Sequence, residues 1–415
     1  MKHVKRYLTI YIALIFISVI IIGFYLIDKE EVDFNWKTVS GDEEAVKDVL
    51  IYGDAQRSYY SPYYNVVPDP FRLSLEESKR IELGRGMHYG WYYQDLQMEK
   101  YVKEYKSFMR GKNTWSENFI ETENQLIYVD VDNLGWGIDE SNDIHIEILD
   151  KETDEVNEFE LSVEENQRIY GVNSISVNDN KLYAQVYMEG QYDEMTDIYQ
   201  DEDAILVIDL NNQTLEDIKF PAKDIEQKEG IYTTLIYQDS GLINGEMNYL
   251  YIYDEYKVDQ NGGYIGDSPL KYELRLYNVG EDSFKSVDLL GDSLYEGEFL
   301  RIYDGAVYVG LLQRDNYILT RFDENLEEKD VVFEENVLNG DLEINPEDVY
   351  PLTAIRNGYF YIAFPAFSTL TATDVSINVF DLGTGENVYQ GIIQAADSMK
   401  QYQYFELNQM EFEDE

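Results

Sequence analysis

Aromatic and acidic residues occur together in several segments that we expect to be loops. Aromatic rings beside carboxylates suit a cation, a basic peptide or a sugar as ligand. We therefore predict a ligand-binding face made by the following residues: Trp136, Asp139, Tyr192, Tyr199, Asp201, Asp259, Tyr264 and Asp267. The alternative is that the rings pack against the bases of their loops while the acids only keep the loops hydrated.

Signals for catalysis or for a tightly bound metal are weak. The histidines His3, His88 and His145 form no HxH or HExxH pattern, so a zinc site is not expected. The chain has no G-x-S-x-G motif and no cysteine, which removes thiol catalysis and thiolate ligands. About one residue in five is acidic, so neighbouring carboxylates occur by chance and identify no catalytic pair. We predict no catalytic residue and no metal site, and only calcium bound loosely by acidic loops as a cofactor.

A pattern of strands repeats five times from about residue 125 onward. The second strands of the five copies begin near Gln125, Lys181, Tyr249, Ala306 and Tyr359. The third strands read IHIEILD, AILVIDL, YELRLYN, YILTRFD and SINVFDL. Alternation of Tyr, Ile, Leu and Val with polar residues is typical of half-buried strands.

A turn-forming side chain stands at or near the end of every third strand. These residues are Asp150, Asp209, Asn278, Asp323 and Asp381. Asp and Asn accept hydrogen bonds from a turning backbone, so we expect a tight turn after each of these strands.

The copies are spaced by 56, 68, 57 and 53 residues, and this pattern resembles β-propeller repeats over about residues 125–395. The resemblance is to propeller repeats in general, because the WD dipeptide, the kelch glycine pair and the sialidase Asp box are all missing. It implies an all-β fold, a β-propeller of about six four-stranded blades, with five or seven as the alternatives.

Residues 36–124 are less regular and predict a further, decorated blade. We expect a strand near Val49–Tyr52 and a short helix at 75–83 opened by a capping box of Ser74 and Glu77. The apolar residues within 98–109 recur at helical spacing, which predicts a helix. A strand is the alternative interpretation of the same residues. Residues 402–412 predict a last strand that pairs with N-terminal strands and closes the ring.

The loops between the second and third strands share one face of a propeller. Here they are long, at about Asn133–Asp143, Met188–Asp203, Lys257–Lys271 and Pro365–Asp374, whereas the turns on the other face are mostly tight. Long loops on a rigid scaffold are where binding residues usually lie, so we place the ligand-binding face there.

The N-terminus predicts a membrane anchor. Residues 7–27 carry no charge and are long enough to cross a bilayer as one transmembrane helix, with Lys2, Lys5 and Arg6 before them. This predicts a single-pass membrane protein with residues 1–6 in the cytoplasm, 28–35 as a linker, and 36–415 as an extracellular domain. A cleaved signal peptide is the alternative, although no small-x-small cleavage site is found.

The charge of the chain is strongly negative. Residues 28–415 hold 29 basic and 82 acidic residues, a net charge of −53, which argues against nucleic acid as a partner. Such a charge suits a salty or cation-rich exterior, or a surface that binds cationic ligands. The high aromatic content, with 38 Tyr and 18 Phe, excludes a disordered chain.

These observations predict a binding or interaction module that uses its long-loop face, with a protein, peptide or glycan partner outside the cell. One alternative is a hydrolase or lyase that acts on a cell-envelope polymer through loop carboxylates. Another is an assembly factor for a membrane complex. Binding is favoured over enzymatic activity because the sequence contains no recognisable catalytic constellation.

Overall fold

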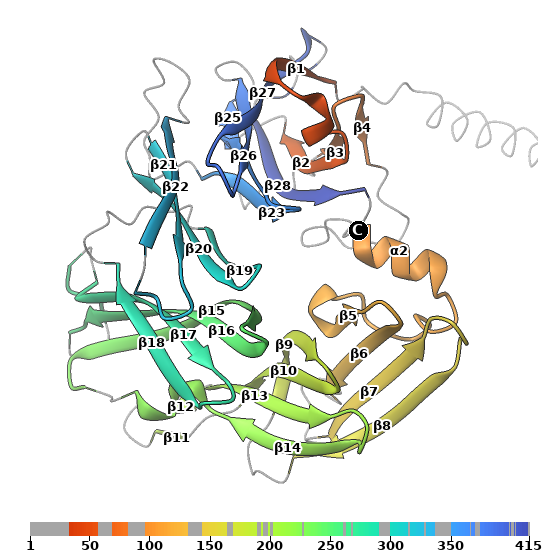
Figure 1. The fold of residues 1–415 in the computed structure, drawn as a ribbon, viewed down its shortest axis with the longest axis vertical. Coiled ribbons are helices and arrows are strands. Elements are labelled where there is room, and N and C mark those ends of the chain that lie inside the picture. Colours follow the sequence, from red (N-terminus) through yellow and green to blue (C-terminus); the bar gives the residue numbers. More distant parts are fainter. Residues whose placement is uncertain are drawn as a thin grey trace, which may run out of the picture. The chain divides into compact units, whose positions relative to one another are not determined.

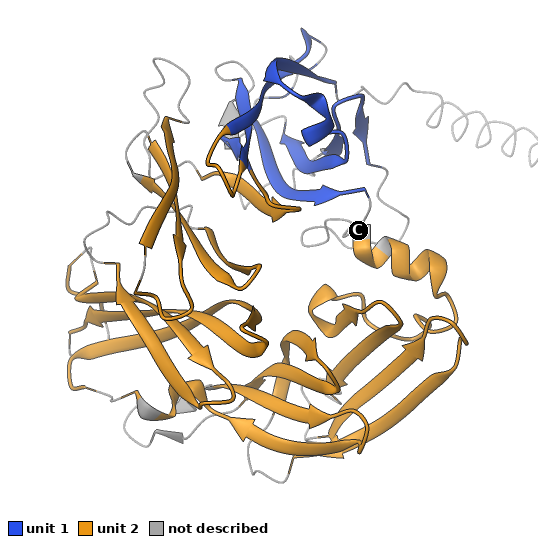
Figure 2. Ribbon diagram, in the orientation of Figure 1, with its two compact units in different colours: residues 1–91, 361–380, 387–414 blue, residues 92–360, 381–386, 415 orange. Residues whose placement is uncertain are grey.

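The computed structural model describes residues 33–56, 69–81, 96–131, 143–163, 169–188, 192–193, 198–199, 202–225, 228–259, 263–266, 269–289, 299–313, 316–327, 329–336, 350–365, 367–369, 374–397, 399, 402 and 404–413. The chain divides into two compact units (Figure 2). Unit 1 comprises residues 1–91, 361–380 and 387–414, and unit 2 comprises residues 92–360, 381–386 and 415.

Unit 2 contains four antiparallel sheets of four strands each, which follow one another along the chain (Figure 1). The first has the order β5 (Phe119–Glu121), β6 (Gln125–Val131), β7 (Asp143–Asp150), β8 (Val156–Ser162). The second has the order β14 (Thr214–Lys219), β13 (Glu202–Asp209), β10 (Lys181–Met188), β9 (Ile169–Asn178). The third runs β15 (Ile231–Ile243), β16 (Glu246–Lys257), β17 (Lys271–Asn278), β18 (Ser283–Asp288), and the fourth β19 (Phe299–Tyr303), β20 (Ala306–Gln313), β21 (Asn316–Phe322), β22 (Lys329–Asn336).

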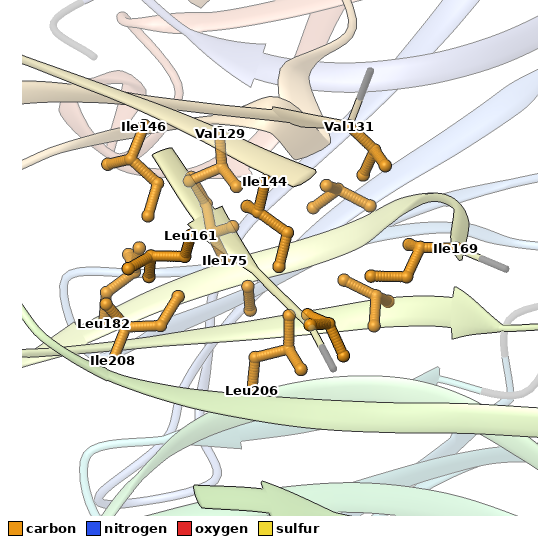
Figure 3. Close-up of a cluster of buried hydrophobic side chains, with 14 of the residues drawn as sticks. Val129, Val131, Ile144, Ile146, Leu161, Ile169, Ile175, Leu182, Leu206 and Ile208 are labelled. Atoms are coloured by element: carbon orange, nitrogen blue, oxygen red, sulfur yellow. The ribbon is translucent and has the colours of Figure 1, made fainter. Parts of the chain in front are cut away.

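Successive sheets of unit 2 pack face to face because their strands alternate apolar residues. Between the first and second sheets, Ile144 and Ile146 of β7 belong to the same buried cluster as Leu182 of β10 and Leu206 of β13 (Figure 3). All four are fully buried, and burying each such side chain contributes about 1.5–3 kcal/mol before the entropy of ordering is counted. A tyrosine-rich cluster joins the second sheet to the third, and an aliphatic one joins the third to the fourth.

Two further sheets have five strands each among the described residues and combine N-terminal with C-terminal segments. One has the order β1 (Phe34–Gly41), β27 (Asn387–Ala395), β26 (Val375–Asp381), β24 (Tyr359–Phe364), β23 (Leu352–Arg356). The other has the order β25 (Phe367–Thr369), β28 (Tyr404–Phe412), β2 (Val49–Gln56), β3 (Asp69–Leu73), β4 (Ser78–Arg80). Because β28 pairs with β2 along its whole length, the predicted last strand at 402–412 and its N-terminal partner are confirmed.

The described residues therefore form an all-β fold with six antiparallel sheets of four or five strands, which is consistent with a propeller-like repeat. The predicted second and third strands are confirmed in all five copies, as β6, β10, β16, β20 and β24 and as β7, β13, β17, β21 and β26. A separate ribbon of β11 (Tyr192–Asp193) and β12 (Ile198–Tyr199) lies in the loop after β10.

The expected turn hydrogen bonds are also present. The carboxylate of Asp381 accepts from the backbone N–H groups of Gly383 and Thr384, at 2.9 and 2.8 Å, and from the Thr384 hydroxyl. Asp150, Asp209 and Asp323 accept from the backbone of their turns in the same way, and Asn278 accepts from Glu281. The repeated Asp or Asn thus stabilises the turn between the third and fourth strands.

Replacing Asp381 by alanine is expected to lower the free energy of unfolding by about 1–2 kcal/mol, because three hydrogen bonds to one carboxylate are lost. The change should be visible as a lower urea midpoint with an unchanged slope. Asp330→Ala, a change of the same residue type at an exposed position of β22 (Lys329–Asn336), is the matched control. Equal midpoints for the two variants would show that the turn carboxylate contributes little.

Short helices complete the described structure, and one sequence prediction fails among them. The nine-residue helix α2 (Leu96–Glu104) confirms the helical interpretation of the 98–109 segment as far as Glu104, and its Met98 and Tyr101 are buried. Residues 105–109 lie beyond the helix. The predicted helix at 75–83 is wrong, because Ser74 and Glu77 bond to each other across the β3–β4 hairpin. Within the described ranges, 3₁₀ turns occur at η1 (Glu43–Ala45), η2 (Ser116–Asn118) and η3 (Pro221–Asp224).

The predicted localisation as a single-pass membrane protein is corrected by this structure. A bilayer span needs about 20 apolar residues in a helix. Across the described ranges the one α-helix has nine residues, and no helix is long and apolar enough to cross a membrane. Residues 7–27, on which the prediction rested, lie outside the described residues, and β1 begins inside the predicted linker at Phe34.

Candidate functional site

The predicted ligand-binding residues are only partly covered by the structure. Trp136, Asp139, Asp201 and Asp267 lie outside the described residues. The backbones of Tyr192 and Tyr199 pair with each other in the β11–β12 ribbon, while their side chains lie outside the described part. Asp259 and Tyr264 are described in full, and both lie in the long loop between β16 and β17.

Asp259 shapes the loop that presents Tyr264. Its backbone N–H donates to the carbonyl of Gly263 at 2.8 Å, and its carboxylate accepts from the Gly263 N–H at 2.9 Å. Directly beyond, Val258 and Tyr264 form an isolated β-bridge, and the Ile265 N–H donates to the Lys257 carbonyl at 2.7 Å. These backbone contacts place Tyr264 and Ile265 alongside the end of β16.

Three tyrosines meet at this end of the third sheet. Tyr232 of β15 lies directly opposite Tyr256 of β16, so the two rings project from the same face. The Tyr264 ring centroid lies 6.0 Å from that of Tyr232 and 5.1 Å from that of Tyr256, with interplanar angles of 72° and 62°. Tyr232 and Tyr264 are 49% and 62% exposed, so the rings form an accessible corner and are not buried packing.

A buried carboxylate stands beside this corner. Asp254 lies two residues before Tyr256 on the same face of β16 and opposite Thr234, whose hydroxyl donates to it. Burial raises the pKa of the Asp254 carboxyl, and the hydrogen bonds from Thr234 oppose that rise. A cation that entered the corner would favour the ionised carboxylate and so would be attracted by both the rings and the acid.

The opposite face of the same strands shows how tyrosines of this chain hold cations. The Arg275 guanidinium carbon lies 3.3 Å from the centroid of the Tyr253 ring, and Arg275 also forms an ion pair with Glu273 at 2.9 Å. Glu255, nearby on β16, pairs with Lys228 at 2.8 Å and accepts from the Tyr253 hydroxyl. These groups bind one another and so stabilise the end of the sheet next to the loop.

A second group of polar side chains, which was not predicted from the sequence, lies on the face of the first sheet opposite Ile144 and Ile146. One donor atom each from His145, Glu147 and Glu158 lie within 4.8 Å of one another, which is close enough to hold a metal ion. His145 and Glu147 are two residues apart on β7, and Glu147 lies directly opposite Glu158 on β8. In the sequence, this group is visible only as a His-x-Glu pair within a strand. That spacing differs from the HxH and helical HExxH patterns that indicate zinc sites.

A hollow at the opposite end of the sheets is lined by Asn178, Asp179, Asn180, Lys181, Tyr183, Asp209 and Asn211. Two of its charged groups are engaged in local structure. Asp209 accepts from the backbone of its own turn, which keeps the pKa of its carboxyl low, and Lys181 pairs with Glu216 at 2.7 Å. The hollow lies at the tight turns that follow β9 and β13.

Comparison with known proteins identifies no family. No protein-family model matches the chain, and no curated protein matches it in sequence. Among solved structures, the polysaccharide lyase Uly1 has a TM-score of 0.34 at 11% identity, over 67% of this chain and 57% of the lyase. The β-propeller domain of the Trilobed protease from Pyrococcus furiosus has a TM-score of 0.30 at 16% identity, over 77% and 72%. A mutant apocarotenoid oxygenase of Synechocystis has a TM-score of 0.40 at 9% identity, over 89% and 97%.

This chain therefore spans less than two thirds of the length of Uly1. Likeness at these identities and scores transfers no activity to this chain. A function for this chain is therefore inferred from the chemistry of its own described residues.

Proposed function

We propose that this protein is a binding module on a six-bladed β-propeller, and that its tyrosine corner receives a cationic group of a basic peptide. The observation that carries the proposal is the exposed corner of Tyr232, Tyr256 and Tyr264 with the carboxyl of Asp254 beside it. The corner lies at the end of the sheet where the long loops join second to third strands. Asp259 supports it by holding the loop in shape.

Ring geometry favours a cation over a flat ligand. Rings inclined by 62° and 72° form a corner, whereas stacking of a planar or sugar ring calls for one open, flat platform. An ammonium or guanidinium group close to tyrosine faces is attracted by their π-electrons, by about 0.5–1 kcal/mol at exposed sites and more once water is excluded. Tyrosine also provides a large contact area at low cost in side-chain entropy.

The charge of the whole chain supports the same class of partner. The full sequence carries a formal net charge of −50, which repels anionic ligands and steers cationic ones toward the surface. Long-range attraction raises the rate of encounter, while the tyrosine corner would supply the specific contact. A basic peptide offers both a high positive charge and single cationic head groups.

The test uses a labelled 12-residue peptide of alternating lysine and serine, with binding followed by fluorescence anisotropy in 300 mM NaCl to screen general attraction. Tyr264→Ala is expected to weaken binding about tenfold, through loss of one ring and of the corner it completes. Tyr264→Phe is expected to keep most of the affinity, because the aromatic face remains.

Trp115→Ala is the matched control, because Trp115 is an exposed aromatic residue of unit 2 outside the corner. Its affinity should equal that of the unmodified protein. Equal affinities for Tyr264→Ala and Trp115→Ala would contradict the proposal, since the peptide would then be held by bulk charge alone.

A further inference from the structure

We propose that His145, Glu147 and Glu158 form a binding site for a divalent first-row transition metal, with Zn²⁺ as the best-fitting ion. The site lies on one face of the sheet of β5 to β8 and is independent of the tyrosine corner. The opposite face of the same strands carries the aliphatic cluster that includes Ile144 and Ile146.

The strand register brings the three donors together. His145 Nε2 already lies 3.2 Å from Glu147 Oε1, which is the separation expected of two atoms that bind one ion at about 2.1 Å. Glu158 is directly opposite Glu147 and exposed, so a change of its side-chain rotamer can close the remaining distance. His145 is 31% exposed, which leaves the site open to solvent and a further coordination position free for water.

Two charged groups stand beside the donors on β7. His145 Nδ1 lies 3.7 Å from Glu160 Oε1, which is too long for a hydrogen bond, so this carboxylate adds negative charge next to the ring without fixing its tautomer. Glu147 presents its second oxygen, Oε2, to Lys112 at 2.7 Å. Glu147 thus has one oxygen held by a lysine while its other oxygen faces His145.

Lys112 is itself fixed, which makes it a support and not a mobile surface charge. Its side chain is only 7% exposed, donates to the carbonyl of Phe108 at 2.7 Å, and lies 4.1 Å from the centroid of the Phe108 ring. With Glu147, Glu158 and Glu160 on one side and Lys112 on the other, the cluster keeps an excess of negative charge. That excess favours a dication.

The donor set selects the class of metal. One imidazole nitrogen with two carboxylate oxygens suits zinc and its first-row neighbours, while calcium prefers six to eight oxygen ligands. Three protein donors with an open position also correspond to the number found in sites where zinc carries a water. This assignment differs from the loosely bound calcium expected from the sequence, because it requires a histidine.

The experiment titrates the purified protein with ZnCl₂ by calorimetry, in 150 mM NaCl and 10 mM CaCl₂ so that general acidic sites are occupied. One equivalent of Zn²⁺ is expected to bind, with affinity reduced about a hundredfold in His145→Gln and at least tenfold in Glu158→Gln. Glu335→Gln, which removes an exposed acid from a fourth strand of another sheet, should bind as the unmodified protein does.

A second readout is thermal. Zn²⁺ should raise the melting temperature of the unmodified protein and of Glu335→Gln, and should leave that of His145→Gln unchanged. Equal Zn²⁺ affinity in the unmodified protein and in folded His145→Gln would overturn the proposal, because binding would then belong to the acidic surface. Failure of the unmodified protein to bind one equivalent would overturn it as well.

Discussion

Asp203→Asn is expected to raise the free energy of unfolding at pH 7.5 by up to about 3 kcal/mol. Asp203 stands near the start of β13, where burial raises the pKa of its carboxyl to about 6 and the nearby Gln185 side chain opposes that rise. Each tenfold difference in proton affinity between folded and unfolded chains corresponds to about 1.4 kcal/mol. Asp203 is only partly buried, so this figure is an upper value.

The sign follows from proton linkage. The folded protein holds the Asp203 proton more tightly than the unfolded chain, whose carboxyl has its ordinary pKa near 3.8. The stabilisation from that proton is fully present below about pH 4 and is lost as the pH rises through about 6. Asparagine has nearly the same shape and can still accept a hydrogen bond from the Asn173 amide. Because asparagine is neutral, it avoids the free-energy cost of burying a charge.

Urea denaturation between pH 4 and pH 7.5 checks this expectation. The free energy of unfolding of Asp203→Asn should fall less over this range than that of the unmodified protein. Asp209→Asn is the matched control, because the N–H groups of Asn212 lower the pKa of that exposed carboxyl and its loss should not stabilise the protein at pH 7.5. Parallel pH profiles for Asp203→Asn and the unmodified protein would rule out the desolvated carboxylate as a source of instability.

The repeated part of the fold could be predicted because its signals are local. Alternation of apolar residues identified the strands, and the Asp or Asn at the end of each third strand identified the turns, since both depend on neighbours a few residues away. The Ser74–Glu77 pair shows the limit of that reasoning. The same side-chain contact that opens a helix also closes the β3–β4 hairpin, and spacing does not distinguish the two.

The candidate sites were harder to predict because they depend on strand register. Tyr264 was identified from its loop, but its partners Tyr232 and Tyr256 lie within strands and meet it only through the β15–β16 pairing. In the same way, Glu158 joins His145 and Glu147 only once β8 is placed beside β7. A sequence pattern predicts which residues of a strand share a face. It does not predict which residue of the neighbouring strand lies opposite each of them.

The position of β28 leads to the prediction with the largest effect on folding. β28 lies between β25 and β2, and its buried side chains are Phe405, Leu407, Met410 and Phe412. Two of them contact other parts of unit 1, since the Phe405 ring lies 5.5 Å from that of Phe34 and the Phe412 ring 5.0 Å from that of Tyr361. The strand is therefore an internal member of its sheet, although it comes last in the sequence.

Ending the chain at residue 403 is expected to prevent unit 1 from folding. Loss of four buried apolar side chains removes about 6–12 kcal/mol of favourable burial, which is comparable with the net stability of a whole domain. It also leaves β2, buried over seven of its eight residues, with an unpaired edge that can recruit other chains. A chain ending at Phe412 is the control and should fold normally.

Strand complementation makes this expectation specific. A synthetic peptide of residues 404–412 added to the shortened chain should restore protection of the β2 amides against hydrogen exchange, because it can re-form the β2–β28 ladder. A peptide of the same composition in scrambled order should not, since its apolar residues would no longer face the core. If the shortened chain unfolds at the same urea concentration as the Phe412 control, β28 is dispensable and the closing role assigned to it is wrong.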